Sequence, residues 1–552
     1  MPVSTFKSVD GDFWRPSAES LELAQVPILS STHSRANPDD TIRANYQQAK
    51  AICQAHGRSI LETLRRPDQH PHGGRHDPNW IPVQSRCGHY RPRLMAFDVS
   101  GIYMLTELGH GLDARNIQTV ATVLPSGGFD LHTPTPDAAK SMPVATPISG
   151  IEKIAIVFAR LQIDGTDHGI RGFIVQLNDG KHMAPRITAK LLPNRAGSSY
   201  LDHAITTFNH VQLPKTALLG EAIHPAGTDP EYFSNLIWRC TIGTLSLSMC
   251  AIPALKSSAW IAGSYALKRK VGETATRKGT PIIQFRTQQL PIFHTIAQGS
   301  VLTEYAAWSI GRFMDTRVDN RLRHAYAILF KTIASAESLN SARILSQEVG
   351  WRGLFEDNIL TRIELESRGN KIAEGDITVL CIRLTSDILR GKVSIPPPLD
   401  PTTLLSQHEA ILLREAASLL QECGNDFRSP MSNRYILPLC QTLVEAIGHR
   451  MAYEAARAAN VDAALLRLYE AGAVKSDLAT YVEHGLVTRR EMDVIEDQCV
   501  ELLLPRLEAL LQDLDVGVYC RAPMLSEEWW EEWLGSLETF EGEEIPVDKE
   551  VF

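Results

Sequence analysis

The spacing of apolar residues changes character twice along the chain. Up to residue 96 it predicts short helices at residues 17–23 and 41–64, followed by a loop rich in Pro, Gly and His. Between residues 97 and 219 short β-type runs alternate with turn sequences, which is typical of a small antiparallel barrel or sandwich. Beyond this segment apolar positions recur every three or four residues, as they do in helices. The chain therefore predicts an α+β fold in which helices flank a β domain.

Five runs carry the prediction of strands in the middle segment. They lie at residues 120–124, 129–132, 154–161, 172–177 and 204–208. Turn sequences at residues 125–128 and 164–167 separate several of them, because Gly, Asp and Pro adopt the backbone angles that tight turns need. Strands at this spacing predict one antiparallel β domain.

The helical part divides at a proline-rich segment, residues 395–401, which is the clearest linker in the chain. Apolar steps such as Tyr326, Leu329 and Ile333 predict a helical bundle before it, and a similar pattern follows it. At 552 residues the chain is long enough for three or four domains. We expect a shortened helical N-terminal segment (1–96), a central β domain (97–219), a helical bundle (220–393) and a C-terminal helical domain (404–552).

Composition excludes some classes of protein. With 44% hydrophobic and 22% charged residues, the chain has the make-up of an ordinary globular protein. Its formal charge of −9 argues against a nucleic-acid partner, which would need clustered Lys and Arg. The nine cysteines are scattered and form no Cys-x-x-Cys pair, so we expect reduced thiols in an intracellular protein.

No apolar run approaches the roughly 20 residues that a membrane span needs. The longest uncharged stretch, residues 240–255, contains Pro253 and several Ser and Thr, and is typical of a buried helix. Residues 1–7 lack the layout of a signal peptide, and residues 549–552 are not a Ser-Lys-Leu type of peroxisomal signal. We therefore expect a cytoplasmic protein without a membrane partner, and a peroxisomal location stays open.

Three histidines in the first loop, His70, His72 and His76, have the chemistry of metal ligands. No Cys or carboxylate stands at ligand spacing beside them, and the surrounding Pro and Gly oppose an ordered helix. We interpret this segment as a solvated loop and predict no metal site.

Residues 103–111, Tyr-Met-Leu-Thr-Glu-Leu-Gly-His-Gly, combine a short apolar strand with a Thr and two glycines. Glycines let a backbone pass close to a flat or anionic group, which a Thr hydroxyl and exposed N–H groups then bind. The segment resembles the flavin-contacting segment of the acyl-CoA oxidase and acyl-CoA dehydrogenase superfamily, most closely the oxidase branch. The resemblance continues through the β domain, and residues 465–469 and 481–485 resemble the additional C-terminal helical domain of the oxidases.

The resemblance implies an FAD cofactor. Leu105, Thr106, Gly109 and Gly111 would lie against its ring system, with Thr106 as the hydrogen-bonding side chain. The Thr hydroxyl would also stabilise negative charge on the reduced ring.

A second motif consists of Arg269, Phe285 and Gln289. It resembles the family's Arg and Phe-x-x-x-Gln motif, whose implied role is to hold the FAD pyrophosphate and adenine across the interface of a homodimer or larger homo-oligomer. A guanidinium suits a pyrophosphate because its donors form paired, charge-assisted hydrogen bonds. The alternative, a solvated basic face formed by residues 268–270, stays open.

Two further segments complete the predicted site. Gly350 and Gly353 resemble the Gly-Gly-x-Gly turn that approaches the flavin in this family, with Val349 in place of the first glycine. Glu374, in Ala-Glu-Gly-Asp, resembles the segment that supplies the catalytic carboxylate. Apolar neighbours predict a poorly solvated position for Glu374, which would raise its pKa and make it a usable base.

Together these segments imply the α,β-desaturation of an acyl-CoA or carrier-bound acyl thioester. Glu374 would remove the α proton, and the β hydrogen would leave as hydride to the flavin. Hydrogen bonds from the Glu374 N–H and a ribityl hydroxyl of FAD would stabilise the enolate oxygen.

The chain departs from the family at residues 140–145 and at Leu112, and its N-terminal segment is short. These departures favour an unusual acyl group, and analogy with divergent relatives in natural-product pathways points to a polyketide-like one. Two alternatives stay open: a flavin-dependent tailoring enzyme acting on a metabolite without CoA, and a catalytically inactive structural homologue. Finally, the tail from residue 526 predicts a terminal helix whose Trp face lies on the body of the protein.

Overall fold

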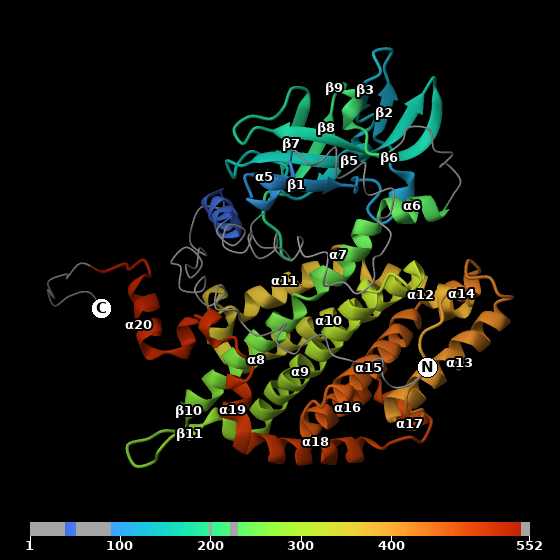
Figure 1. The fold of residues 1–552 in the computed structure, drawn as a ribbon. Helices are drawn as coiled ribbons and strands as arrows, with labels where there is room; N and C mark the ends of the chain where they lie inside the picture. Colours follow the sequence, from blue (N-terminus) through green and yellow to red (C-terminus); the bar gives the residue numbers. More distant parts are fainter. Residues whose placement is uncertain (1–38, 51–89, 198–200, 221–229, 543–552) are drawn as a thin grey trace, which may run out of the picture.

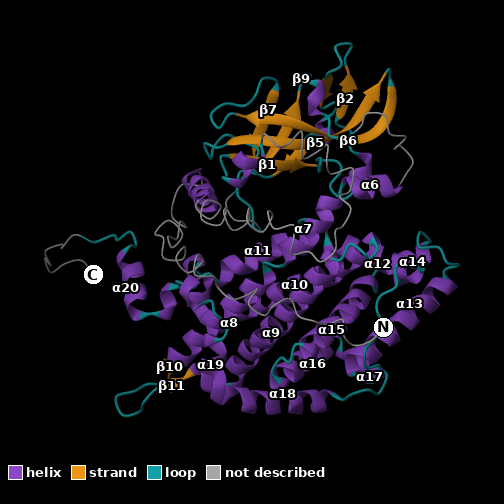
Figure 2. Cartoon of the chain, viewed as in Figure 1, coloured by secondary structure: helices purple, strands orange, loops and turns teal. Residues whose placement is uncertain are grey.

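The computed structural model describes residues 39–50, 90–197, 201–220 and 230–542. A β domain forms one layer, and the helices that follow it in sequence form a larger bundle beneath it (Figure 1). The strands gather almost entirely in the upper layer (Figure 2). This arrangement confirms the predicted α+β fold class.

Residues 39–50 form a helix that is anchored on the β domain. The Tyr46 hydroxyl donates to Asp202 at 2.7 Å, and the Lys153 ammonium donates to Asp202 at 2.7 Å and to Tyr46 at 2.9 Å. All three side chains are buried. The predicted helix at 17–23 and the loop with His70, His72 and His76 lie outside the described residues, and the helix predicted at 41–64 is described only to residue 50.

Within the described residues, nine strands build the β domain. They are β1 (Val99–Met104), β2 (Val120–Val123), β3 (Phe129–His132), β4 (Lys140–Met142), β5 (Glu152–Ile163), β6 (Thr166–Asn178), β7 (Ile187–Leu191), β8 (Ala204–Phe208) and β9 (Val211–Leu213). One sheet has the order β1-β5-β2-β3-β9 with β6 paired to β5, and a second has the order β4-β8-β7. Every predicted strand is present. The sequence analysis missed β7 and the three-residue strands β4 and β9; segments as short as the last two show no alternation.

The prediction of a wholly antiparallel domain is wrong for the larger sheet. Strands β1 and β2 both run parallel to β5, with Tyr103 opposite Ile156 and Ala121 opposite Leu161. Parallel pairs need long crossover connections, and the chain between β1 and β5 supplies them through β2, β3 and β4. The strand pattern alone does not reveal which strands such connections bring together.

Most of the helices after the β domain share one hydrophobic core that extends from Leu245 to Leu525. They are α6 (Pro230–Leu236), α7 (Trp238–Ser248), α8 (Ala251–Lys268), α9 (Arg286–Met314), α10 (Asn320–Glu348), α11 (Leu360–Ile372), α12 (Ile377–Leu389), α13 (Leu404–Glu422), α14 (Pro430–Tyr435), α15 (Cys440–Ala458), α16 (Ala463–Ser476), α17 (Leu478–Glu483), α18 (Arg489–Leu503), α19 (Leu507–Gln512) and α20 (Glu527–Gly535); a short α5 (Arg91–Met95) precedes β1, and the hairpin β10 (Lys270–Val271) and β11 (Thr280–Pro281) follows α8. Helices α6 and α17 pack in separate clusters. The Pro-rich linker is held by Arg450, which donates to the Pro396 carbonyl at 2.9 Å and to Glu409 at 2.6 Å.

The sequence predicts one buried helix for the uncharged stretch at 240–255. The structure instead divides this stretch between two helices, α7 and α8. Helix α7 ends at Ser248 and α8 begins at Ala251, so that Pro253 stands in the first turn of α8, where a missing N–H costs little. By length and composition residues 238–268 are one candidate for a membrane span. Half of the most apolar window is buried inside the structure, and α8 contacts both α9 and α10, which is the environment of a core helix.

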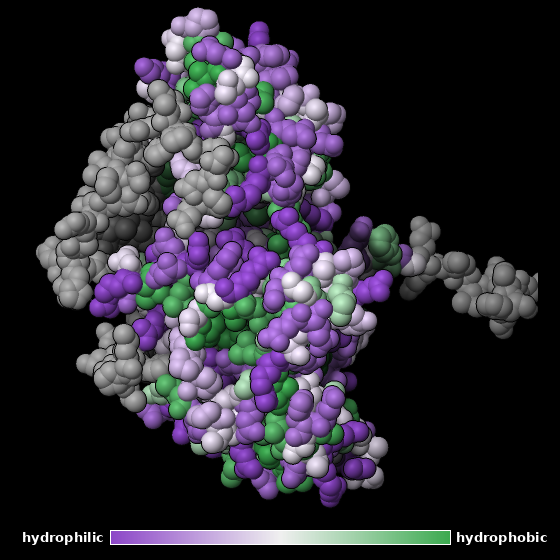
Figure 3. All heavy atoms as spheres, turned by 90° about the vertical axis from the view of Figure 1, so that its right-hand side faces the viewer, coloured by the Kyte–Doolittle hydropathy of each residue, from purple (hydrophilic) through white to green (hydrophobic). Residues whose placement is uncertain are grey.

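The terminal helix α20 lies on the body of the protein, as predicted. Trp530 meets Trp351 edge to face with ring centroids 6.1 Å apart, and the Arg352 guanidinium lies 3.9 Å from the Trp530 ring centroid. The Trp533 indole N–H donates to Asp357 at 3.0 Å. Elsewhere, polar side chains cover most of the face in Figure 3, and apolar ones gather over its helical half.

Candidate functional site

Glu374 stands in the turn between α11 and α12, three residues before α12 begins. Its φ of +55° lies in the left-handed region, which a residue with a Cβ adopts only where its surroundings impose it. Gly375 follows at a φ of +100°, so two successive residues turn the chain sharply. This backbone projects the Glu374 side chain away from α12 and towards α7.

The carboxylate of Glu374 forms an ion pair with Arg239 of α7. The Arg239 guanidinium also lies 5.0 Å from the ring centroid of Tyr103, at the end of β1. The guanidinium therefore fixes the direction in which the carboxylate points. The sequence analysis did not find Arg239, because its relation to Glu374 exists only in the tertiary structure.

Gly243 of α7 makes room for Glu374. A Cβ on residue 243 would stand 2.5 Å from the Glu374 Cδ and 2.9 Å from its Cγ, far inside normal contact. Glycine in a helix is unfavourable by about 1 kcal/mol relative to alanine, so a buried one calls for a packing reason. Here the reason is the carboxylate itself.

The surroundings of Glu374 differ in part from the prediction of an apolar, poorly solvated position. Ile377 is buried, but Ile372 and Val379 are 66% and 40% exposed in this single chain. The Glu374 side chain itself is 21% exposed. The difference arises because residues 373–376 form a junction between helices, and only one of the apolar neighbours faces the core.

Residues 105–111, the segment predicted to contact the flavin, follow β1 and are stabilised by a buried ion pair. Glu107 accepts from the Lys140 ammonium at 2.9 Å, and both side chains are fully buried. The Thr119 N–H and hydroxyl also donate to Glu107, at 2.9 and 2.6 Å. These contacts lower the pKa of Glu107 and offset the effect of burial, while burial lowers the pKa of Lys140 to about 8. The pair holds residues 105–111 against β4.

Within this segment the two glycines have different surroundings. A Cβ on Gly109 would stand 2.8 Å from the Cβ of Asp137, so that glycine is needed for packing inside the loop. A Cβ on Gly111 would meet nothing within 4 Å. Leu105 is buried and Leu112 is 66% exposed, so the segment offers an open backbone beside exposed apolar surface.

The motif of Arg269, Phe285 and Gln289 lies where α8 ends and α9 begins. Arg269 is exposed, and Phe285 is 46% exposed. Gln289, in contrast, is buried, and its amide donates to the Ile283 carbonyl at 2.8 Å. The structure therefore places Arg269 and Phe285 on the surface and gives Gln289 a structural partner within the chain.

The turn with Gly350 and Gly353 follows α10 at this same end of the bundle. Gly350 has a φ of +72° with open space around it, whereas a Cβ on Gly353 would overlap the Ser346 carbonyl. From Lys331, which contacts the Glu374 turn, to the end of α10 at Glu348, the helical rise corresponds to roughly 25 Å. The predicted residues therefore form two separate groups in one chain: residues 105–111 with Glu374, and Arg269 and Phe285 with Gly350.

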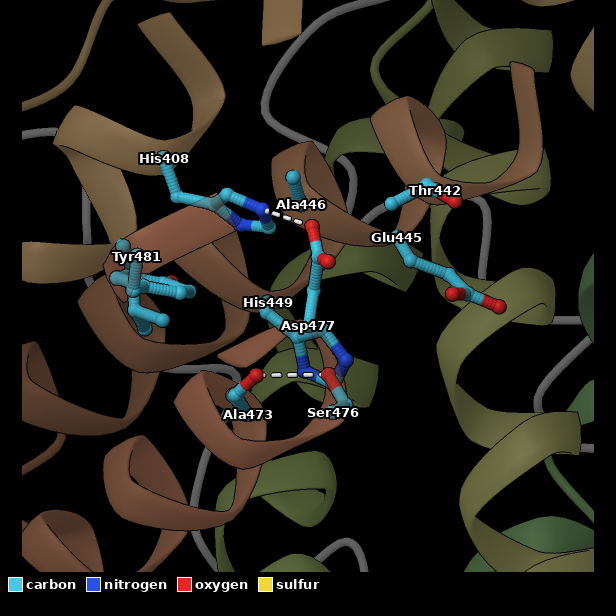
Figure 4. Close-up of a pocket in the computed structure, with 10 residues that line it drawn as sticks. His408, Thr442, Glu445, Ala446, His449, Ala473, Ser476, Asp477 and Tyr481 are labelled. Atoms are coloured by element: carbon cyan, nitrogen blue, oxygen red, sulfur yellow. Dashed lines mark hydrogen bonds and ion pairs between the residues drawn. The ribbon is translucent and has the colours of Figure 1, made fainter. Parts of the chain in front are cut away.

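A polar cavity of about 100 Å³ lies elsewhere, among α13, α15, α16 and α17 (Figure 4). His408 contacts Asp477 across it at 2.7 Å, and Tyr481 lies beside them. None of the predicted site residues lines this cavity. Among the residues that the structure describes, no three or more His, Cys, Asp or Glu side chains form a group that could hold a metal ion.

Comparison with known proteins gives a consistent picture, although no family model matches the chain. The chain is 26% identical over 316 residues to "Acyl-coenzyme A oxidase 3, peroxisomal" of Arabidopsis thaliana. This match covers 54% of this chain and 46% of that protein. It is 30% identical over 240 residues to "Peroxisomal acyl-coenzyme A oxidase 1" of the same plant, and this match covers 41% of this chain and 35% of that protein. The chain thus matches less than half the length of these curated relatives.

The fold as a whole is similar to that of acyl-CoA oxidase-2 of Caenorhabditis elegans, whose structure is described as bound with FAD, ascaroside-CoA and ATP. The TM-score is 0.77 at 17% identity, over 96% of this chain and 91% of that one. A likeness at this level of identity establishes the fold alone, and the sequence matches above cover about half of the chain or less. The chain therefore has the fold of the acyl-CoA oxidases, and part of its sequence is similar to theirs.

Proposed function

We propose that this protein is an FAD-dependent oxidoreductase that desaturates an acyl-CoA or carrier-bound acyl thioester between its α and β carbons. The observation that carries the proposal is Glu374. Its carboxylate is positioned by a left-handed backbone, a guanidinium partner and a glycine that makes room for it. Such an arrangement is costly for a surface loop and is typical of a catalytic base.

The chain's residues fit FAD in two places. Residues 105–111 present the open backbone of Gly111 beside exposed Leu108 and Leu112, a surface suited to a flat ring system. Arg269, exposed at the end of α8, suits a pyrophosphate, and Gly350 leaves open space nearby. FAD, when bound, supplies the acceptor for the hydride that leaves the β carbon.

The chain's own residues supply the acid–base chemistry. Glu374 takes the α proton, and its ion pair with Arg239 orients the carboxylate beforehand. Among the described residues, the Glu374 N–H meets no hydrogen-bond acceptor, so it is free to donate to the thioester oxygen as negative charge develops there. The Tyr103 ring packs against the Arg239 guanidinium and so helps to fix the position of the ion pair.

The visible spectrum of the purified protein tests this proposal. Under anaerobic conditions a bound flavin should bleach when a suitable acyl-CoA is added, and Glu374→Gln should abolish the bleaching while the flavin stays bound. Bound flavin that no thioester bleaches would favour a tailoring enzyme acting on another metabolite. A protein that binds no flavin would contradict both enzymatic functions and leave the inactive homologue.

We further propose that the site is completed in a homodimer. The two groups of residues are too far apart to hold one flavin together in one chain, but Arg269 of a second copy could complete the group around Glu374. Mixing inactive Glu374→Gln with inactive Arg269→Ala should restore activity to about one quarter of wild type, because half of randomly mixed dimers are hybrid and each hybrid has one intact site. Absence of complementation in verified hybrid dimers would contradict a shared site.

The acyl group is part of the same proposal. Residues 140–145 and Leu112 differ from the oxidase pattern beside the flavin-contacting segment, which supports a bulky, polyketide-like acyl group in secondary metabolism rather than a straight chain. Comparing bleaching rates with straight-chain and branched or cyclic acyl thioesters tests this. The curated relatives named above are peroxisomal, and imaging of a fluorescent fusion would decide between a peroxisomal and a cytosolic location.

A further inference from the structure

Lys331 is a fully buried lysine in the middle of α10. Its ammonium donates to the carbonyls of Ala373 and Gly375, both at 2.5 Å. These two carbonyls flank Glu374 on either side. A buried ammonium without partners would be very costly, so these contacts account for a lysine at this place.

Thr244 of α7 binds the carbonyl of Glu374, which lies between the two carbonyls that Lys331 binds. Its hydroxyl contacts the Glu374 carbonyl at 2.7 Å and the Cys240 carbonyl within its own helix at 2.9 Å. Three successive carbonyls, those of residues 373, 374 and 375, are thus bound by side chains from two different helices. Because α7 and α10 contact each other, they form a rigid frame around the turn.

The turn needs such a frame. A left-handed φ at a non-glycine residue is of the order of 1–3 kcal/mol less favourable than an ordinary one, and it persists only where the surroundings impose it. Neither Ile372 nor Val379, the exposed apolar residues nearby, contributes a buried contact that would do so. The Asp376 carboxylate caps α12 and Arg239 holds the Glu374 carboxylate, whereas the hydrogen bonds to the three carbonyls act on the peptide planes of the turn itself.

We propose that Lys331 and Thr244 are positioning residues for the catalytic base: by binding the carbonyls of residues 373–375, they hold Glu374 in its left-handed conformation and direct its carboxylate and N–H into the site. The inference rests on the proposed function for its catalytic consequence. Its structural part does not depend on that function, because it concerns only the order of the turn.

Burial sets the electrostatics of this contact. Desolvation lowers the pKa of Lys331 to about 8, while the carboxylates of Glu374 and Asp376 oppose that shift. Lys331 therefore carries a positive charge at neutral pH, and its hydrogen bonds to carbonyls are charge-assisted. A methionine of similar length keeps the volume of the side chain but removes both donors.

Amide hydrogen exchange measured by mass spectrometry on the FAD-loaded protein tests the structural part. In Lys331→Met, and to a smaller extent in Thr244→Val, peptides that span residues 373–376 should exchange at least tenfold faster than in wild type. Ser338→Ala is the matched control, because Ser338 is also buried in α10 but bonds only to the Ser335 carbonyl of its own helix. Unchanged exchange at the turn in both variants would overturn the proposal.

Anaerobic stopped-flow reduction by a saturating acyl-CoA tests the catalytic part. Lys331→Met should slow flavin reduction at least a hundredfold without changing the Kd of the thioester, and Thr244→Val should slow it about tenfold, because both leave the binding surface intact but release the base. Equal losses in binding and rate, or a full rate in both variants, would overturn the positioning role. If wild type itself is not reduced, the proposed function fails, and hydrogen exchange still decides whether Lys331 orders the turn.

Discussion

Replacing Gly243 with alanine should inactivate the proposed base, Glu374, although Glu374 itself is not mutated. The added methyl group would stand 2.5 Å from the Glu374 Cδ, where normal carbon contacts are about 3.5 Å. Helix α7 packs on α10, so the flexible carboxylate is the group that must move. The required displacement is about 1 Å.

A displacement of this size decides the rate rather than the fold. Misplacing a reacting group by about 1 Å can slow a reaction a hundredfold, which corresponds to about 2.7 kcal/mol in the activation barrier. Replacing a helical glycine with alanine favours the helix by about 1 kcal/mol, which offsets the small cost of moving the side chain. We therefore expect a folded, flavin-binding variant whose melting temperature stays close to that of wild type.

The assay is the rate of anaerobic flavin bleaching at a saturating acyl-CoA, measured beside thermal unfolding. Gly299→Ala is the matched control, because Gly299 is also buried in a helix but an added Cβ would lie at ordinary distances of 3.7 and 3.8 Å from its neighbours. The control should keep its full rate. A Gly243→Ala protein that reduces its flavin as fast as wild type would refute the idea that the carboxylate works from this position.

Three further changes probe the structure around the site. Lys140→Met leaves Glu107 buried without its ion partner and should lower the free energy of unfolding in urea by about 3–5 kcal/mol; a loss below 1 kcal/mol would show that the pair is dispensable. Trp530→Ala removes the contacts of α20 with Trp351 and Arg352 and should expose the C-terminal segment to limited proteolysis, whereas an unchanged digestion pattern would mean that the contacts of Trp533 suffice. Burial raises the pKa of Glu337 to about 7, so its ionisation destabilises the fold progressively between about pH 4.5 and 7. Glu337→Gln should therefore be more stable than wild type by about 1–3 kcal/mol at pH 8 and should show no advantage near pH 4.5. A difference in stability that does not depend on pH would count against this assignment.

The periodicity of the sequence was enough to predict the class of fold, the order of its parts and the five strands of four or more residues that alternate clearly. It also predicted the docked Trp face of α20, because residues 530 and 533 share one side of a helix. Short motifs with a backbone requirement, such as Gly350 and residues 105–111, were visible for the same reason: glycine is informative wherever a turn or a close approach excludes other residues. These features depend on neighbours along the chain.

Features that depend on contacts between distant segments were not predictable. The parallel pairing of β1 and β2 with β5 is set by long crossovers, and the break between α7 and α8 by packing on both sides. Lys331 did leave a signal, since a lysine on the apolar face of a helix needs a buried partner, but the partner carbonyls are about forty residues away. Arg239, Gly243 and Thr244 left none. The sequence by itself thus determined which carboxylate resembles a base, and only the tertiary structure decided what holds it, because the groups that orient Glu374 come from helices that meet only after the core has formed.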